Sequence, residues 1–128
     1  MYPADCKYTK DHEWIKVASD GSAQVGITSY AAEALGDVVF VQLPESGAGF
    51  AHGEEFGTVE SVKTVSELFM PVDAEVLETN GELEAHPEYV NEDPFGKGWM
   101  VKVSLKGALP ADLMDAAAYD AHVSAEAH

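Results

Sequence analysis

The chain contains no arginine and few lysines. Seven lysines face 23 aspartates and glutamates, and the formal net charge is -16. Binding to nucleic-acid phosphates or to an anionic membrane surface requires the opposite charge, so we expect neither nucleic acid nor a membrane as a partner. A charge of this size instead favours a soluble monomer and speeds its encounter with partners that present basic surfaces.

Cysteine is equally scarce. Cys6 is the single cysteine, which excludes an intrachain disulfide and a zinc site built on paired thiolates. Cys6 and His12 could serve as the nucleophile and base of an enzyme, but no third catalytic member is evident, and an unreactive thiol is the favoured interpretation. The histidines show no zinc-ligand spacing, so we assign no metal; they are His12, His52, His86, His122 and His128.

Long apolar runs are also absent. No stretch approaches the ~20 apolar residues that span a bilayer, and the first residues lack a signal-peptide or transit pattern. We therefore expect a cytoplasmic bacterial protein, or a mitochondrial matrix protein if the sequence is a mature organellar form. A chain of 128 residues with 46% hydrophobic residues is the size of one domain, residues 1–128, with one core.

Short β-prone runs separated by turn residues dominate the chain. They predict strands over residues 13–17, 23–28, 37–43, 56–62, 65–70, 74–78 and 99–105, with 37–43 buried on both faces and 56–78 arranged as a meander. Ser29 is expected to cap a helix over residues 30–35, and a single helical turn is expected near residues 88–91. Pro110 is expected to open a C-terminal helix that frays near Ser124; its apolar stripe would contain Leu113, Met114, Ala117, Ala118 and Ala121. The fold class is mainly β, a small sandwich or barrel with peripheral helices.

Lys63 is isolated among acids. It is the single base in the segment between Lys16 and Lys97, and it lies at the predicted tip of the hairpin, with Glu60 and Glu67 close in sequence. On this pattern alone, a solvating turn lysine is the favoured interpretation. An exposed tip lysine is also accessible to a modifying enzyme.

Motifs along nearly the whole chain resemble the glycine cleavage system H protein family. The central match is Glu60-Ser61-Val62-Lys63 followed by Met70-Pro71-Val72. Further matches are Tyr8 with His12-Glu13-Trp14, Gly26-Ile27-Thr28 with Tyr30-Ala31, Leu35 to Val41, Leu43-Pro44, Pro87 with Asn91, and Asp93-Pro94-Phe95 with Gly98-Trp99. The resemblance implies a barrel-sandwich hybrid related to lipoyl domains, with lipoate attached through an amide to Lys63.

The same resemblance implies a carrier and not an enzyme. In the family, glycine decarboxylase passes an aminomethyl group to the lipoyl arm, a tetrahydrofolate-dependent aminomethyltransferase removes it, and dihydrolipoamide dehydrogenase reoxidises the arm; a lipoate-attaching enzyme is a fourth partner. Glu13 and Glu67 correspond to positions of the cleft that shelters the loaded arm. Asp73-Ala74 departs from the family's small polar residue and glycine, which questions any turn with positive φ there.

Several alternatives stay open at this point. A relay that passes lipoate to other lipoyl enzymes is a lower-weight variant of the carrier function. A free-standing lipoyl or biotinyl domain is disfavoured, since biotinyl lysines are usually flanked by methionine and lipoyl domains of 2-oxoacid dehydrogenases usually have aspartate before the lysine, whereas Val62 and Thr64 flank Lys63. An enzyme that uses Cys6, or an acidic binding module with unmodified Lys63, belongs to a different functional class.

Overall fold

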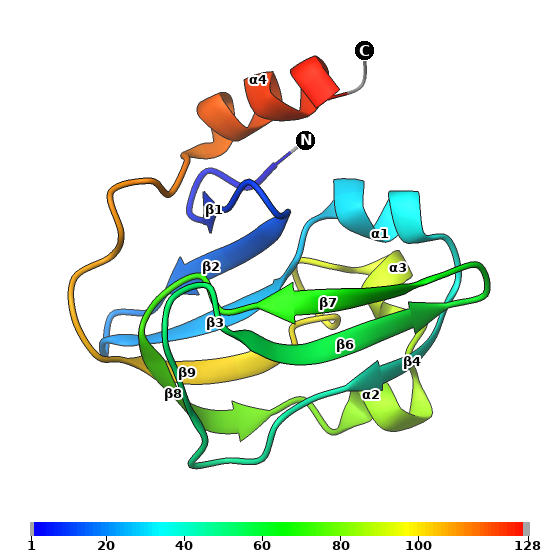
Figure 1. Ribbon diagram of the computed structural model, residues 1–128, viewed down its shortest axis with the longest axis horizontal. Helices are drawn as coiled ribbons and strands as arrows, with labels where there is room; N and C mark the ends of the chain where they lie inside the picture. Colours follow the sequence, from blue (N-terminus) through cyan, green and yellow to red (C-terminus); the bar gives the residue numbers. More distant parts are fainter. Residues whose placement is uncertain (1, 127–128) are drawn as a thin grey trace.

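A computed structural model describes residues 2–126 as two antiparallel sheets with short helices around them (Figure 1). The larger sheet contains, in spatial order, β1 (Lys7–Tyr8), β2 (Glu13–Val17), β3 (Ser22–Ile27), β9 (Val101–Leu105), β8 (Ala74–Thr79) and β5 (Gly49–Phe50). The smaller sheet contains β4 (Val38–Gln42), β6 (Glu55–Ser61) and β7 (Val65–Phe69). The prediction of a mainly β fold with peripheral helices is confirmed.

The main core lies between these two sheets. Because alternate residues of a strand point to opposite faces, each sheet directs one apolar row inward. Val25 and Val103 come from the larger sheet, and Val59 and Leu68 come from the smaller one; all four are almost completely buried. Complete burial of each such side chain is worth about 1.5–3 kcal/mol, so this contact holds the β6–β7 hairpin firmly on the larger sheet.

The four helices within residues 2–126 are short and lie around the sheets: α1 (Ser29–Leu35), α2 (Glu82–Ala85), α3 (Tyr89–Glu92) and α4 (Ala116–Glu126). Thr28, and not Ser29, caps α1, because its extended backbone lets Oγ1 accept a hydrogen bond from Ala31 N at 3.2 Å. Gly36 ends α1 with φ 81°, which favours glycine, although its ψ of -159° differs from that of a left-handed helix. No helix within residues 2–126 is long and apolar enough to cross a membrane.

Two expectations about the strands are wrong. β4 is not covered on both faces, since Val39 and Phe40 are 47% and 50% exposed. It also pairs with β6 alone and forms an edge of the smaller sheet. The hairpin is not part of a meander, because β8 pairs with β5 and β9 of the other sheet and not with β7. Asp73 and Ala74, which link the two sheets, need no positive φ.

The C-terminal helix also differs from the prediction. It begins at Ala116 and not at Pro110, because Met114 exchanges two backbone hydrogen bonds of 2.8 Å with Tyr8 and thereby extends the strand pairing. Its buried side chain is Tyr119, which stacks on Tyr8 with 4.7 Å between ring centres, whereas Ala117, Ala118 and Ala121 are exposed. The helix continues past Ser124 to Glu126. The single helical turn expected near residues 88–91 is α3, and a second turn, α2, precedes it.

Candidate functional site

Lys63 lies at the exposed tip of the β6–β7 hairpin, as the sequence predicts. The turn is closed by a hydrogen bond from Ser61 N to Thr64 O at 2.8 Å. Ser61 Oγ also accepts hydrogen bonds from Lys63 N and Thr64 N, at 3.3 and 3.2 Å. Each bond contributes roughly 1 kcal/mol, so together they hold the backbone that presents the lysine.

A second set of hydrogen bonds supports this tip from below. Val62 N donates to Asp37 O at 3.1 Å, which fastens the turn to the segment between α1 and β4. Asn91 holds that segment in turn, since its Nδ2 donates to Gly36 O at 2.8 Å and its Oδ1 accepts from Val38 N at 2.9 Å. The lysine therefore stands on a turn whose backbone is tied to α1, α3 and β4 (Figure 1).

The Lys63 side chain itself makes few contacts. A Cβ atom on Gly36 would lie 3.5 Å from Lys63 Cε, so the aliphatic stem passes the end of α1. Within residues 2–126, Lys63 Nζ has no carboxylate within ion-pair distance, whereas Lys16 and Lys106 pair with Asp5 and Glu75. Its amine is thus accessible despite the acids close to it in sequence.

The Glu13 carboxyl lines a cleft of about 190 Å³ between α1 and strands β2, β6 and β7. Thr9 Oγ1 donates to Glu13 Oε1 at 2.6 Å, and Phe69 N donates to Oε2 at 3.3 Å. Glu13 is 2% exposed, and this burial raises its pKa from 4.5 to about 7, although the two hydrogen bonds oppose the shift. A carboxyl group in this state can release its proton when a cation approaches.

Glu67 lines the same cleft but is exposed to solvent. The two acids expected from sequence therefore lie at one cleft, one buried and one at its rim. Most of the other lining residues are apolar or aromatic, and they include Ile27, Tyr30, Ala34, Leu35, Val59 and Leu68; Asp11, His12 and Ser66 add polar groups. α1 forms one wall and ends at Gly36, beside the Lys63 stem, so an arm on Lys63 has a route along α1 into the cleft.

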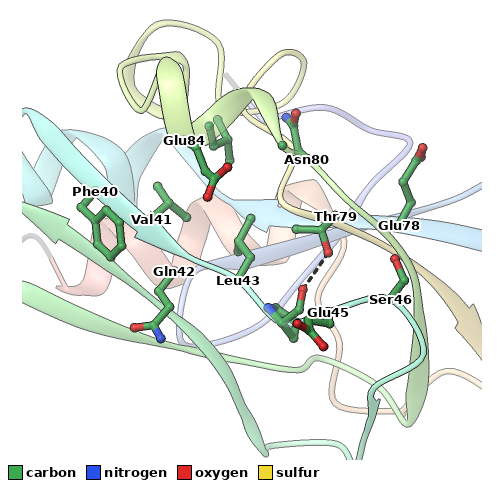
Figure 2. A pocket seen from close by; sticks show the side chains of 13 residues that line it. Phe40, Val41, Gln42, Leu43, Glu45, Ser46, Glu78, Thr79, Asn80 and Glu84 are labelled. Carbon is green, nitrogen blue, oxygen red and sulfur yellow. Dashed lines mark hydrogen bonds between the residues drawn. The ribbon is translucent and has the colours of Figure 1, made fainter.

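A larger cleft, about 460 Å³, lies elsewhere (Figure 2). It is formed where the β4–β5 connection faces β8 and α2. Two of its lining residues are joined by a hydrogen bond, in which Thr79 Oγ1 donates to Pro44 O at 2.8 Å. Figure 2 shows Glu45, Glu78 and Glu84 around this cleft. Lys63, Glu13 and Glu67 do not line it, so its size does not identify it as the functional site.

Cys6 does not form a catalytic pair with His12. The thiol is 3% exposed, and burial, with Asp5 beside it, raises its pKa to about 11. At neutral pH it is therefore a protonated, unreactive thiol. His12 Nδ1 instead lies 2.8 Å from the Tyr119 hydroxyl.

Sequence reasoning missed two groups of residues around the site. Asn91 supports the tip from a helix 28 residues beyond Lys63, and its role depends on backbone positions that no local pattern indicates. His12 meets His122 and Glu126, which approach from α4 at the other end of the chain. The i, i+4 spacing of His122 and Glu126 weakly indicated that these two side chains are neighbours on one helix, but nothing in it pointed to His12.

Comparisons with known proteins agree with this geometry. The family model for glycine cleavage H-protein matches residues 6–126. A glycine cleavage system H protein of Marinobacter nauticus is 56% identical over 126 residues, covering 97% of this chain and 96% of the relative. One from Mycolicibacterium vanbaalenii is 52% identical over 127 residues, covering 95% and 96%.

A solved structure gives the same result for the fold. The crystal structure of a glycine cleavage system H protein from Mycobacterium marinum matches with a TM-score of 0.90 and 44% identity, over 96% of this chain and 99% of that one. The barrel-sandwich fold is thereby confirmed. The chain belongs to the glycine cleavage H-protein family, the lipoyl carriers of the glycine cleavage system, and is a carrier and not an enzyme.

Proposed function

We propose that this chain bears lipoate in amide linkage on Lys63 and carries the aminomethyl group of glycine between enzymes. It would receive the group from glycine decarboxylase (P protein), deliver it to the tetrahydrofolate-dependent aminomethyltransferase (T protein), and then visit dihydrolipoamide dehydrogenase (L protein). The observation that carries the proposal is one accessible amine on a hydrogen-bonded hairpin tip. A lipoate-attaching enzyme must first recognise that tip.

The residues at the tip fit such a group. Amide formation needs an accessible amine, and Lys63 Nζ is exposed and free of ion pairs within residues 2–126. Bound lipoate supplies a disulfide that accepts and releases the transferred group. The chain's own residues present the arm: the Ser61 turn limits its starting directions, which reduces the entropy cost of reaching an active site.

Glu13 and Glu67 would receive the loaded end of the arm. The apolar walls of their cleft exclude water, which protects a group that is prone to hydrolysis. An ammonium beside Glu13 favours the ionised carboxylate, so binding would draw the proton off Glu13 and form a buried ion pair. Glu67 at the rim would add a weaker, solvent-screened attraction.

Partner enzymes would meet the outer face of the smaller sheet beside the tip. The strand register places Phe40, Glu60 and Val65 in one row across β4, β6 and β7, and all three are exposed. Val62, at the tip, is 71% exposed. Exposed apolar side chains on both sides of Glu60, within a strongly acidic protein, suit partners whose entrances combine basic and apolar groups.

We also propose that residues 1–128 act as one monomeric domain in the cytoplasm. The larger sheet joins β1 near the start of the chain to β9 near its end, which supports a single folding unit. The relatives named above are bacterial, which supports the location.

Intact-mass spectrometry tests the proposal. Co-expression with a lipoate ligase should add one lipoyl mass, and peptide mapping should place it on Lys63. Lys63→Arg should remain unmodified, whereas the matched control Lys97→Arg should be modified fully. A wild-type mass that stays unchanged while a known acceptor is modified in parallel would overturn the carrier assignment for this chain.

A further inference from the structure

We propose that His12, His122 and Glu126 form a binding site for one divalent transition-metal ion of the zinc class. His12 lies in the β1–β2 connection, and the other two lie one turn apart on α4. Glu126 Oε2 is 3.0 Å from His12 Nε2 and 2.9 Å from His122 Nε2. This inference does not depend on the proposed function, and it would replace the sequence-based expectation that the chain binds no metal.

The geometry of the three ligand atoms suits such an ion. All three lie within 4.8 Å of one another. In a tetrahedral zinc site the metal–ligand bonds are about 2.0–2.1 Å, so neighbouring ligand atoms are roughly 3.3 Å apart. Small side-chain rotations would therefore bring the atoms into position. Two imidazoles and one carboxylate leave a fourth position for water, and this donor set suits Zn²⁺, Co²⁺ or Ni²⁺.

The hydrogen bonds behind His12 orient it as a metal ligand. His12 Nδ1 contacts the hydroxyl of Tyr119 at 2.8 Å, and that hydroxyl contacts Thr28 Oγ1 at 2.7 Å. Tyr119 and Thr28 are completely buried. The second nitrogen of a ligating histidine normally donates to an outer partner, and the Tyr119 hydroxyl is placed to accept from Nδ1, which would leave the lone pair of Nε2 for a metal ion. His12 also has φ 71°, the one positive φ among non-glycine residues 2–126.

A cation would relieve the repulsion that arises when both Nε2 atoms carry lone pairs. In that tautomer His12 Nε2 faces the Glu126 carboxylate oxygen at 3.0 Å, and His122 Nε2 lies 2.9 Å from the same oxygen and 3.3 Å from Lys10 O. Two acceptors at that distance repel unless a proton or metal ion lies between them. The protein's net charge of -16 attracts a divalent cation. The side chains of His12, His122 and Glu126 are 16%, 31% and 42% exposed, so the ion has access from solvent.

The position of the site gives it a structural consequence. His12 lines the cleft that contains Glu13, whereas His122 and Glu126 belong to the C-terminal helix. A metal ion would cross-link α4 to the rim of the cleft. Amide protons of α4 should then exchange more slowly with solvent when the ion is bound.

Zinc titration of the metal-free full chain tests the site. Competition with a chromophoric chelator at moderate salt, which screens exposed carboxylates, should give one equivalent of bound Zn²⁺. His122→Ala and Glu126→Gln should each weaken binding by about tenfold or more, and Tyr119→Phe, which removes the outer-shell hydroxyl, by about tenfold. The matched control is His86→Ala, since His86 pairs with Glu88 at 3.0 Å on the surface without a third ligand; it should bind zinc like the wild type.

Three results would overturn the proposal. One is a wild-type protein that binds no zinc, in which case a proton occupies the position between the imidazoles and the carboxylate. Another is unchanged affinity in both α4 variants, which would place zinc on scattered surface acids. The third is an equal loss of affinity in His86→Ala. Circular dichroism of each variant shows whether it is folded, and a Co²⁺ spectrum with intense four-coordinate bands in the wild type alone gives an independent readout.

Discussion

The hairpin tip and the Glu13 cleft are built in opposite ways. At the tip, Lys63 is exposed, and Ser61, two residues away, makes the bonds that shape its turn. In the cleft, Glu13 is buried, and one of its two partners is Phe69, 56 residues along the chain. Presentation of the amine is thus largely a local property, whereas shelter for what it carries depends on packing between distant elements.

Because of this difference, substitutions at the tip and substitutions in the cleft should have different effects. A change at the tip should alter attachment or delivery with little loss of stability, because few buried contacts depend on it. A change in the cleft should alter stability and its pH dependence, because a buried carboxyl group is coupled to folding. The predictions below use matched residues from the two regions.

The largest effect should follow from moving the lysine by one position. In the double variant Lys63→Thr with Thr64→Lys, the amine stays on the hairpin but moves one residue along the turn that Ser61 Oγ holds. A misplacement of this size costs about 10²-fold in rate or more when geometry governs the reaction. The rate of lipoyl attachment, followed by intact mass, measures it. Attachment at the wild-type rate would show that the turn does not direct recognition.

Glu13→Gln should change how stability depends on pH. Burial raises the pKa of folded Glu13 from 4.5 to about 7. Between those values the folded state holds a proton that the unfolded chain has released, so this group's contribution to stability is complete below pH 4.5 and is lost as pH rises through 7. The difference in unfolding free energy between wild type and variant should shift by about 3 kcal/mol across that window.

Urea unfolding at several pH values measures this difference. The variant should lose less stability than the wild type as pH rises from 4.5 to 7. Glu13→Gln should also speed the release of formaldehyde from the loaded protein if Glu13 pairs with the aminomethyl ammonium. Parallel pH curves for the two proteins would contradict the raised pKa, and an unchanged release rate would contradict the pairing.

Ser61→Ala should affect the tip more mildly. It removes the hydroxyl that accepts hydrogen bonds from Lys63 N and Thr64 N but keeps the backbone bond from Ser61 N to Thr64 O. We expect a loss of about 1 kcal/mol in urea unfolding, from two partly exposed bonds, and slower lipoyl attachment. Ser66→Ala on the same hairpin is the control. Equal effects of the two substitutions would mean that the Ser61 hydroxyl has no special role.

The smallest effect should come from Glu67→Gln. This acid is exposed at the rim of the cleft, so its removal should change stability by less than about 0.5 kcal/mol. Comparison with Glu13→Gln by the same urea titrations isolates the effect of burial on two acids of one cleft. A change in the free energy of unfolding as large as that of Glu13→Gln would contradict this comparison.

The accuracy of the sequence predictions follows the range of the interactions involved. The predictions of the hairpin around Lys63 and of the β2–β3 hairpin were correct, because β-prone runs on either side of turn residues specify these hairpins locally. The prediction that β4 is buried on both faces was wrong, because an apolar run does not show whether another element will cover the second face of the strand. The start of α4 was wrong because Met114 pairs with Tyr8, more than 100 residues earlier.

For the candidate site, too, the sequence predicted some features and could not predict others. Lys63, Glu13 and Glu67 were named through family motifs, and the structure places the two acids in one cleft beside the route from the lysine. That one acid is buried and the other exposed could not be read from sequence, because the alternation along a strand does not reveal which neighbours fold over it.

By itself, the sequence determined the isolation of one lysine on a turn, the acidic charge that disfavours nucleic-acid binding, and the motifs that identify the family. Tertiary structure alone decided the raised pKa of Glu13, the support that Asn91 gives the tip, and the meeting of His12 with His122 and Glu126. The physical reason is that turns depend on neighbouring residues, whereas desolvation and convergent ligands require segments brought together by the core.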